Sequence, residues 1–203
     1  SEMCIRDRVG CGVQLGPEQM LSPERYEQIL NWLYDRDIAD PGAQPRIGCP
    51  EHSLRVKATC APHYMRIWIQ RRRAAGLPVH RRGHGLYRMQ RGCLAGTEIV
   101  FISHRGDVYP CGYLPLPAGN ILNEPFAQIW QNSPVLRQFR EPVELAGKCG
   151  LCEFRKVCLG CRARAYAVSG DPLGEEPFCQ YVPVRMARQD SSRSAPGRAD
   201  RPT

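Results

Sequence analysis

The chain has 203 residues, of which 42% are hydrophobic, a formal net charge of +8 at pH 7 and eleven cysteines. This size and apolar content allow a buried core without disulfides, and no apolar run reaches the roughly 18 residues of a membrane span. No secretory signal is recognisable, so we expect a reducing cytoplasm. In that compartment clustered cysteines are more often metal ligands or redox groups than disulfides, and an odd total fits full pairing poorly.

The first eight residues, SEMCIRDR, resemble translated adapter sequence at the edge of a metagenomic fragment. We therefore expect residues 1–8 to be a sequencing artefact and coding sequence upstream of them to be missing. Beyond them, Ser22 and Pro23 are a typical helix start, because serine caps the first turn and proline is tolerated there. Apolar residues at helical spacing follow and predict a helix over 23–36.

The next two predicted elements flank a cysteine. Residues 54–59, LRVKAT, alternate enough in polarity to predict a short strand that runs into Cys60. A basic amphipathic helix is predicted beyond Pro62 and ends near residue 75, where Gly76 can supply the left-handed conformation of a helix end.

The middle of the chain is expected to form a β-hairpin followed by short helices. Residues 97–103, TEIVFIS, are rich in β-branched and aromatic side chains, HRGD can turn, and VYPCGY returns with Cys111 on the second strand. Helices are then predicted over residues 123–130, 133–139 and 162–170.

A dense group of cysteines lies between the last two of these helices. The stretch KCGLCEFRKVCLGC spaces its cysteines as C-x2-C-x5-C-x2-C in predicted loops, where closely spaced thiolates can converge on one metal centre. All-thiolate coordination suits zinc and an iron-sulfur cluster alike, so the spacing alone leaves both open. A single zinc would leave three of the seven cysteines of this region unexplained; the seven are Cys93, Cys111, Cys149, Cys152, Cys158, Cys161 and Cys179.

The order of these cysteines, with Gly106 five residues before Cys111, resembles the SPASM domain, the C-terminal cluster-binding extension of many radical S-adenosylmethionine (SAM) enzymes. Within that family, three stretches are similar to the proteins that modify tetrapyrroles in heme and heme d1 biosynthesis: KATCAPHYMR, GCLAGTEIVFISHRGDVYPCGYLP and CRARAYAVSGDPLGEEPFC. Cys158 and Cys161 are separated by two residues where the family usually has three, which leaves the number of auxiliary clusters open.

The resemblance implies an α/β fold in two parts. Residues 9–90 would be the C-terminal remnant of a radical SAM partial (β/α) barrel, and residues 91–182 a cysteine-rich α+β SPASM iron-sulfur domain. Residues 183–203 are rich in Arg, Ser, Pro and Asp and poor in apolar side chains, so we expect a disordered tail there.

The resemblance also implies a division of the cysteines between metal centres. One auxiliary [4Fe-4S] cluster would be ligated by Cys149, Cys152, Cys158 and Cys179. Another would be left with Cys93, Cys111 and Cys161, and Cys60 would be its candidate fourth ligand. In a one-cluster protein some of these would be plain buried thiols.

Several residues outside the cysteine pattern are candidates for the substrate site. His63 follows Cys60 beside a predicted strand end, which would place it at the carboxyl mouth of a barrel, so it is a candidate catalytic, substrate-binding or metal-edge residue. Guanidinium groups pair with carboxylates in a bidentate fork, which makes four arginines candidate partners for porphyrin propionates: Arg66, Arg71, Arg81 and Arg82. A solvated basic face is the alternative.

The family activity implies chemistry that starts outside this chain. An N-terminal C-x3-C-x2-C cluster reduces SAM to a radical that abstracts hydrogen from a propionate side chain, and the side chain or its carboxylate is lost. The implied cofactors are SAM, that [4Fe-4S] cluster and one or two auxiliary clusters; the partners are a porphyrin-type substrate and an electron donor such as ferredoxin or flavodoxin, with no membrane. No C-x3-C-x2-C occurs in these 203 residues, so we expect the chain alone to be inactive.

Two other functions stay open. A zinc-stabilised module could use its basic surface on nucleic acid, although seven ordered cysteines and the lack of aromatic residues among the basic ones speak against it. A SPASM enzyme that modifies a peptide is the second alternative, and the CAPHY stretch makes it less favoured.

Overall fold

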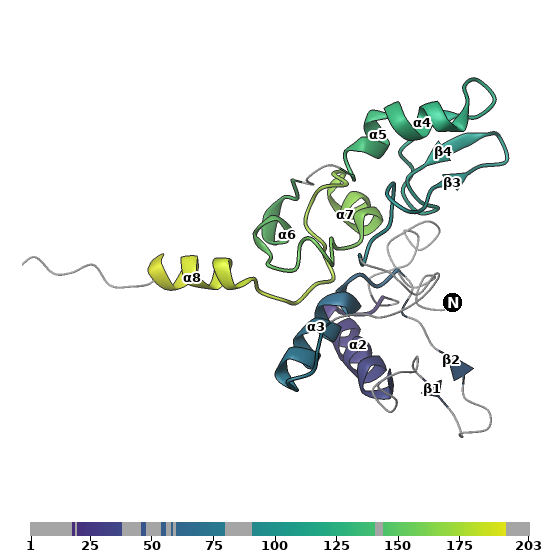
Figure 1. The fold of residues 1–203 in the computed structure, drawn as a ribbon. Coiled ribbons are helices and arrows are strands. Elements are labelled where there is room, and N and C mark those ends of the chain that lie inside the picture. The colour runs from purple at the N-terminus through teal and green to yellow at the C-terminus, as the bar shows by residue number, and fades with distance from the viewer. Residues whose placement is uncertain are drawn as a thin grey trace, which may run out of the picture.

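The computed structural model describes residues 18, 20–37, 46–47, 54–55, 58, 60–79, 91–140 and 144–193. Figure 1 shows three parts in this chain: a pair of helices, a lobe that carries the small sheet, and a cysteine-rich segment between them from which the last helix extends. The buried apolar residues of the described ranges form three clusters: one in the helix pair, one in the sheet lobe, and one that joins the lobe to the cysteine-rich segment.

The helix pair consists of α2 (Pro23–Asp37) and α3 (His63–Ala74). The predicted start of α2 is confirmed, since the Ser22 hydroxyl accepts a hydrogen bond from the amide of Arg25 at 3.2 Å. The predicted end of α3 is confirmed as well, with Gly76 at φ +66°. The two helices bury a shared apolar cluster made of Tyr26, Leu30, Leu33, Tyr34, Ala61, Ile67 and Trp68.

Strands in this region are shorter than the sequence predicted. β1 (Arg46–Ile47) pairs antiparallel with β2 (Leu54–Arg55), so the strand expected over 54–59 is described for two residues only. Barrel strands are parallel. The barrel remnant therefore stays a prediction for residues 9–90.

The sheet lobe contains the predicted hairpin, but Cys111 lies beyond its second strand and not on it, in an isolated bridge with Leu114. β3 (Phe101–Ile102) and β4 (Asp107–Tyr109) pair antiparallel, and β5 (Gly119–Asn120), which was not predicted, adds a third strand beside β4. Gly and Asn are poor strand formers, so β5 has no local signal. α4 (Phe126–Asn132) and α5 (Pro134–Arg137) follow, and the lobe is held together by a buried cluster of Val108, Ile129 and Leu136.

The cysteine-rich segment carries α6 (Gly147–Leu151) and α7 (Arg162–Ser169), and α8 (Val184–Arg193) follows it. α7 and the left-handed Gly170 at its end were predicted, whereas α6 lies where loops were expected. α8 lies where disorder was expected; its first turn bonds to the carbonyl of Pro183, and Arg, Met, Ala and Gln favour helix. None of the described helices is long and apolar enough to cross a membrane.

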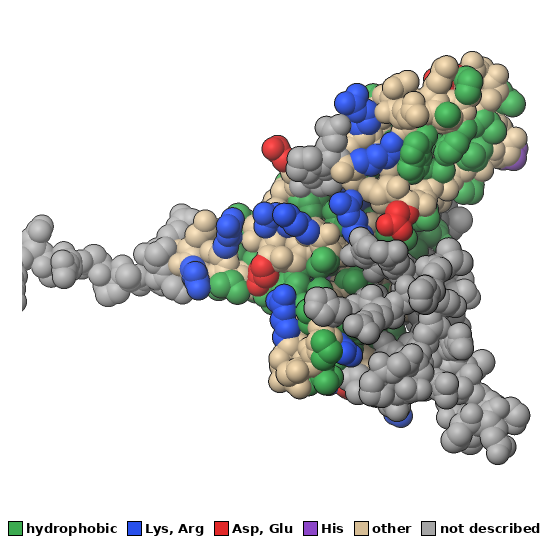
Figure 2. Space-filling view, in the orientation of Figure 1, with side chains coloured by type: hydrophobic (Ala, Val, Ile, Leu, Met, Phe, Trp, Pro, Cys, Tyr) green, Lys and Arg blue, Asp and Glu red, His purple; other side chains and the backbone are tan. Residues whose placement is uncertain are grey.

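The parts of the chain expose different kinds of side chain. Figure 2 shows Lys and Arg side chains over the region of α6 and α8, and a hydrophobic patch over the sheet lobe. The exposed apolar side chains of that lobe include Ile99, Phe101, Ile102, Tyr113 and Leu122.

Candidate metal centre

The backbone turns sharply between Cys158 and Cys161. Leu159 and Gly160 both have positive φ, +63° and +62°, which is unusual for leucine and easy for glycine. The two thiols of this C-x2-C pair consequently end in different surroundings. Cys158 lines a cavity, whereas Cys161 packs into an apolar cluster with Leu114, Phe139 and Ala163.

The cavity beside α6 gathers the thiols that the family resemblance assigned to one cluster. Its space of about 370 Å³ is partly open to solvent and is lined by Cys149, Cys152, Cys158 and Cys179. All described cysteines are free thiols. Within the described ranges, no three His, Cys, Asp or Glu side chains stand close enough to hold a single metal ion. The thiols instead share the walls of one cavity.

Backbone amides point at two of these sulfurs. The amide of Phe154 donates to Cys152 Sγ and the amide of Glu176 to Cys149 Sγ, each at 3.4 Å. Burial raises the pKa of Cys152 to about 11 and also raises the pKa of Cys158. Buried thiols in these surroundings would be deprotonated by binding a metal centre, whose positive charge favours the thiolate.

Cations stand at the same cavity. Arg66, Lys148 and Arg155 line it, and Lys148 Nζ donates to the carbonyl of Cys179 at 2.6 Å. Burial raises the pKa of the Cys179 thiol, and Arg66 and Lys148 act in the opposite direction. A donor set of thiolates with amide N–H groups and cations around it fits an anionic iron-sulfur cluster.

A second group of cysteines lies toward the sheet lobe. Cys111 packs against the apolar cluster that contains Cys161. Burial raises the pKa of both thiols, and the nearby Cys93 adds to the increase in each. Cys93, Cys111 and Cys161 therefore lie in one region, and their role as ligands of a second cluster stays a prediction. The carbonyl of Cys60 accepts a hydrogen bond from Arg164 Nη1 at 3.2 Å. The role of the Cys60 thiol as a fourth ligand stays a prediction.

A buried charged network joins the helix pair to the cysteine-rich segment. Glu176 and Arg164 are fully buried, and Arg164 Nε donates to Glu176 Oε1 at 2.9 Å. Glu176 also accepts from the amides of Cys161 and Phe178. Burial alone would raise the pKa of Glu176, but the opposing effect of Arg164 and the hydrogen bonds lower it to about 2. This carboxylate is therefore ionised at neutral pH.

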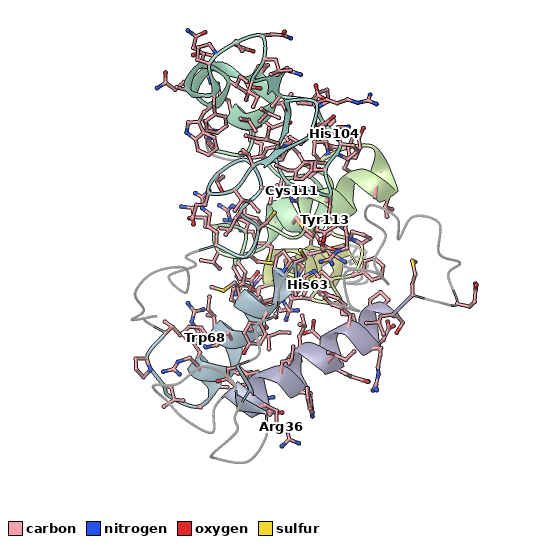
Figure 3. All side chains as sticks on the ribbon, turned by 90° about the vertical axis from the view of Figure 1, so that its right-hand side faces the viewer. Arg36, His63, Trp68, His104, Cys111 and Tyr113 are labelled. Carbon is pink, nitrogen blue, oxygen red and sulfur yellow. The ribbon has the colours of Figure 1, made fainter. Side chains whose placement is uncertain are left out.

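His63 lies at the end of the same network. It is fully buried at the start of α3, lines the sulfur cavity, and has Nε2 3.8 Å from Glu176 Oε2. Burial lowers its pKa to about 3, so the ring is neutral. Figure 3 shows His63 where α3 meets the cysteine-rich segment, with Cys111 and Tyr113 farther toward the lobe.

Sequence reasoning found His63 but missed its charged neighbours. Arg164 and Glu176 both lie in the stretch CRARAYAVSGDPLGEEPFC, which carried part of the family resemblance. Nothing in their local sequence separates a buried charge from an exposed one. Only their burial by segments distant in the chain identifies them.

The arginines predicted for a substrate carboxylate have different surroundings. Arg66 is buried and pairs with Glu27, with Nη2 2.5 Å from Oε2. Arg71 is exposed and pairs with Asp35. Arg81 and Arg82 lie outside the described residues. A role in binding propionates therefore stays a prediction for these residues.

Residues 93–162 match the SPASM family, described as an iron-sulfur cluster-binding domain. This match begins at Cys93 and includes Cys161, so both proposed cysteine groups contribute to it. The resemblance to the SPASM domain is confirmed over these residues, which do not include Cys179.

Known proteins similar to this chain include heme synthases. An AdoMet-dependent heme synthase from Methanosarcina barkeri is 49% identical over 163 residues, or 80% of this chain and 43% of that protein. One from Nitratidesulfovibrio vulgaris is 50% identical over 169 residues, 83% of this chain and 43% of the relative. A pre-heme d1 synthase from Dinoroseobacter shibae is 36% identical over 92 residues, 43% of this chain and 23% of the relative. The resemblance to the radical SAM/SPASM group of heme biosynthesis is confirmed, and the chain spans less than half of these relatives.

Proposed function

We propose that this chain, with its SPASM domain and its similarity to AdoMet-dependent heme synthases, is the C-terminal part of a radical SAM enzyme of heme biosynthesis. It would hold an auxiliary [4Fe-4S] cluster on Cys149, Cys152, Cys158 and Cys179. The observation that carries the proposal is that these thiols line one cavity, although Cys179 lies far along the chain from Cys149.

The residues around the cavity have separate tasks in this proposal. The thiolates ligate iron, and the amides of Phe154 and Glu176 hydrogen bond to sulfur. Arg66 and Lys148 offset the negative charge of the centre. Phe154 and Leu145 restrict access of water from the apolar side. When bound, the cluster would supply one-electron chemistry.

The second cysteine group supports a second auxiliary cluster. Its ligands would be Cys93, Cys111 and Cys161, with Cys60 as the fourth or with one iron left open. The amide of Cys161 donates to the Glu176 carboxylate, and the backbone amide of Glu176 donates to Cys149 Sγ, so the two centres would share Glu176 as support.

The substrate and partners of the whole enzyme are proposed on the similarity to heme synthases. The substrate would be a porphyrin whose propionate loses its carboxylate or side chain, and the electron donor a ferredoxin or flavodoxin. SAM and its cluster would bind to sequence outside these 203 residues, since C-x3-C-x2-C is absent here. The chain alone would then not cleave SAM. The cytoplasm is the expected compartment, because its reducing conditions keep thiols free.

The test is an anaerobic assay of iron, acid-labile sulfide and zinc per chain after reconstitution of the 203 residues. One cluster gives about four iron and four sulfide, and two give about eight of each. Cys152→Ala should lower both by about four, whereas Cys11→Ala, outside the SPASM pattern, should leave them unchanged. Stoichiometric zinc without sulfide would overturn the proposal and favour the zinc-binding alternative.

A further inference from the structure

His63 has an unusual position for a polar side chain. It is fully buried, and neither ring nitrogen has a hydrogen-bond partner among the described residues. An imidazole always carries at least one N–H group, and leaving a buried donor unsatisfied costs about 1–3 kcal/mol. The N–H group of the ring therefore lacks an acceptor among the described side chains.

The nearest carboxylate does not serve as that acceptor. The separation of 3.8 Å between His63 Nε2 and Glu176 Oε2 is too long for a hydrogen bond. The oxygens of Glu176 already accept from three donors: the amides of Cys161 and Phe178 and the guanidinium of Arg164. Both carboxylate oxygens of Glu176 therefore already accept from donors other than His63.

The orientation of the ring is set by packing. Tyr26 on α2 stands edge-on to His63, with ring centroids 5.3 Å apart and planes at 88°. The ring also lines the cavity that Cys149, Cys152, Cys158 and Cys179 line. A buried donor without a partner therefore borders the sulfur-lined space.

We propose that His63 is a positioning residue whose ring N–H donates a hydrogen bond to a sulfur of the cluster held by these four cysteines. This inference rests on the proposed function. Four thiolates complete the coordination of a [4Fe-4S] cluster, so the ring acts as donor and not as ligand. A donor facing sulfur stabilises the more negative, reduced cluster and raises its reduction potential.

The cations at the cavity are partly engaged with protein groups. Arg66 uses Nη1 on Gln70 and Nη2 on Glu27, whereas its buried Nε has no hydrogen-bond partner among the described residues. Lys148 uses Nζ on the carbonyl of Cys179 and on Glu175, and Arg155 uses Nη1 on the carbonyl of Cys152. All three also act on the cluster through their charge. His63 would add a directed contact from the side of α3, which ties the helix pair to the redox properties of the SPASM domain.

The experiment uses the whole 203-residue chain reconstituted anaerobically with iron and sulfide. Iron and sulfide are measured first, and the midpoint potential is then measured by titration followed by electron paramagnetic resonance. If the parent holds about eight irons, the titration is done in a Cys111→Ser background that leaves one cluster. His63→Phe keeps a buried ring without N–H, and His63→Gln returns an N–H donor.

The expected result is unchanged iron and sulfide in His63→Phe with a lower potential, and a shift back toward the parent in His63→Gln. Ile67→Val is the matched control, because Ile67 is buried on the same helix within the apolar cluster, and its potential should equal that of the parent. His63→Met provides the same test if the phenylalanine variant does not fold.

Three outcomes would overturn the inference in different ways. A parent chain without iron and sulfide would overturn the proposed function itself. A His63→Phe chain with full iron and the parental potential would refute the hydrogen bond alone. Loss of iron from a folded His63→Phe chain would show that the His63 ring binds iron as a ligand and does not act as a hydrogen-bond donor.

Discussion

Replacing Arg164 with methionine is expected to lower the free energy of unfolding by about 3–5 kcal/mol, the usual effect of removing one partner from a buried ion pair. Arg164 and Glu176 are both fully buried and 2.9 Å apart. Methionine retains much of the aliphatic stem but no charge. Arg164 is the main group that lowers the pKa of Glu176 to about 2, so without it burial raises this pKa, and folding has to bury an unpaired carboxylate or protonate it.

The size of the effect follows from the other contacts of this guanidinium. Arg164 Nη1 also donates to the hydroxyl of Tyr26 and the carbonyl of Cys60, each at 3.2 Å. Hydrogen bonds to charged groups contribute about 1.5–3 kcal/mol each, but removing Arg164 also removes the cost of burying it. The buried, unpaired Glu176 is therefore the dominant loss.

The assay is urea unfolding of the reduced chain followed by circular dichroism. Arg105→Met is the control, since Arg105 lies exposed in the turn between β3 and β4, and its effect should stay within about 0.5 kcal/mol. The double variant Arg164→Met/Glu176→Gln should be more stable than the sum of the single changes predicts. A loss below about 1 kcal/mol in Arg164→Met would refute the reasoning.

Two further comparisons test the backbone and the packing. Gly160→Ala should lower the midpoint of thermal unfolding more than Gly170→Ala. Both glycines have positive φ, but a Cβ at Gly160 would lie 2.8 Å from the Cβ of Glu176, whereas nothing lies within 4 Å of a Cβ at Gly170. Equal effects of the two changes would contradict this reasoning. Leu136→Ala should cost about 2–5 kcal/mol and Leu122→Ala under about 0.5 kcal/mol, because Leu136 is fully buried and Leu122 is 78% exposed. Similar losses in urea unfolding would show that burial does not set the cost.

Local signals predicted the helices well. The start of α2, both ends of α3 and the end of α7 follow from a serine or proline at the start or a left-handed glycine at the end, all within a few residues of the element. α6, α8, β1 and β5 were missed. α6 and β5 contain glycine, which gives no local preference for helix or strand, so their form depends on neighbouring segments.

The sequence predicted the cysteine ligands of the candidate site better than the charged side chains around them. The spacing of the cysteines predicted a metal centre, and the resemblance assigned Cys149, Cys152, Cys158 and Cys179 to one group. The charged groups around them were not predicted. Charged residues are mostly exposed, so Arg164 and Glu176 would be expected at the surface from the sequence alone. The burial of a charge depends on which distant segments pack over it.

The sequence by itself determined the ligand chemistry, since thiolates at C-x2-C-x5-C-x2-C spacing are a property of adjacent residues. The resemblance already assigned Cys158 and Cys161 to different centres, but only the tertiary structure showed the left-handed turn at Leu159 and Gly160 that separates them, and only it placed His63 at the cavity that the sulfurs line. The physical reason is that spacing acts within a loop, whereas partition between two sites requires α3, the sheet lobe and the segment after α7 to pack around that loop.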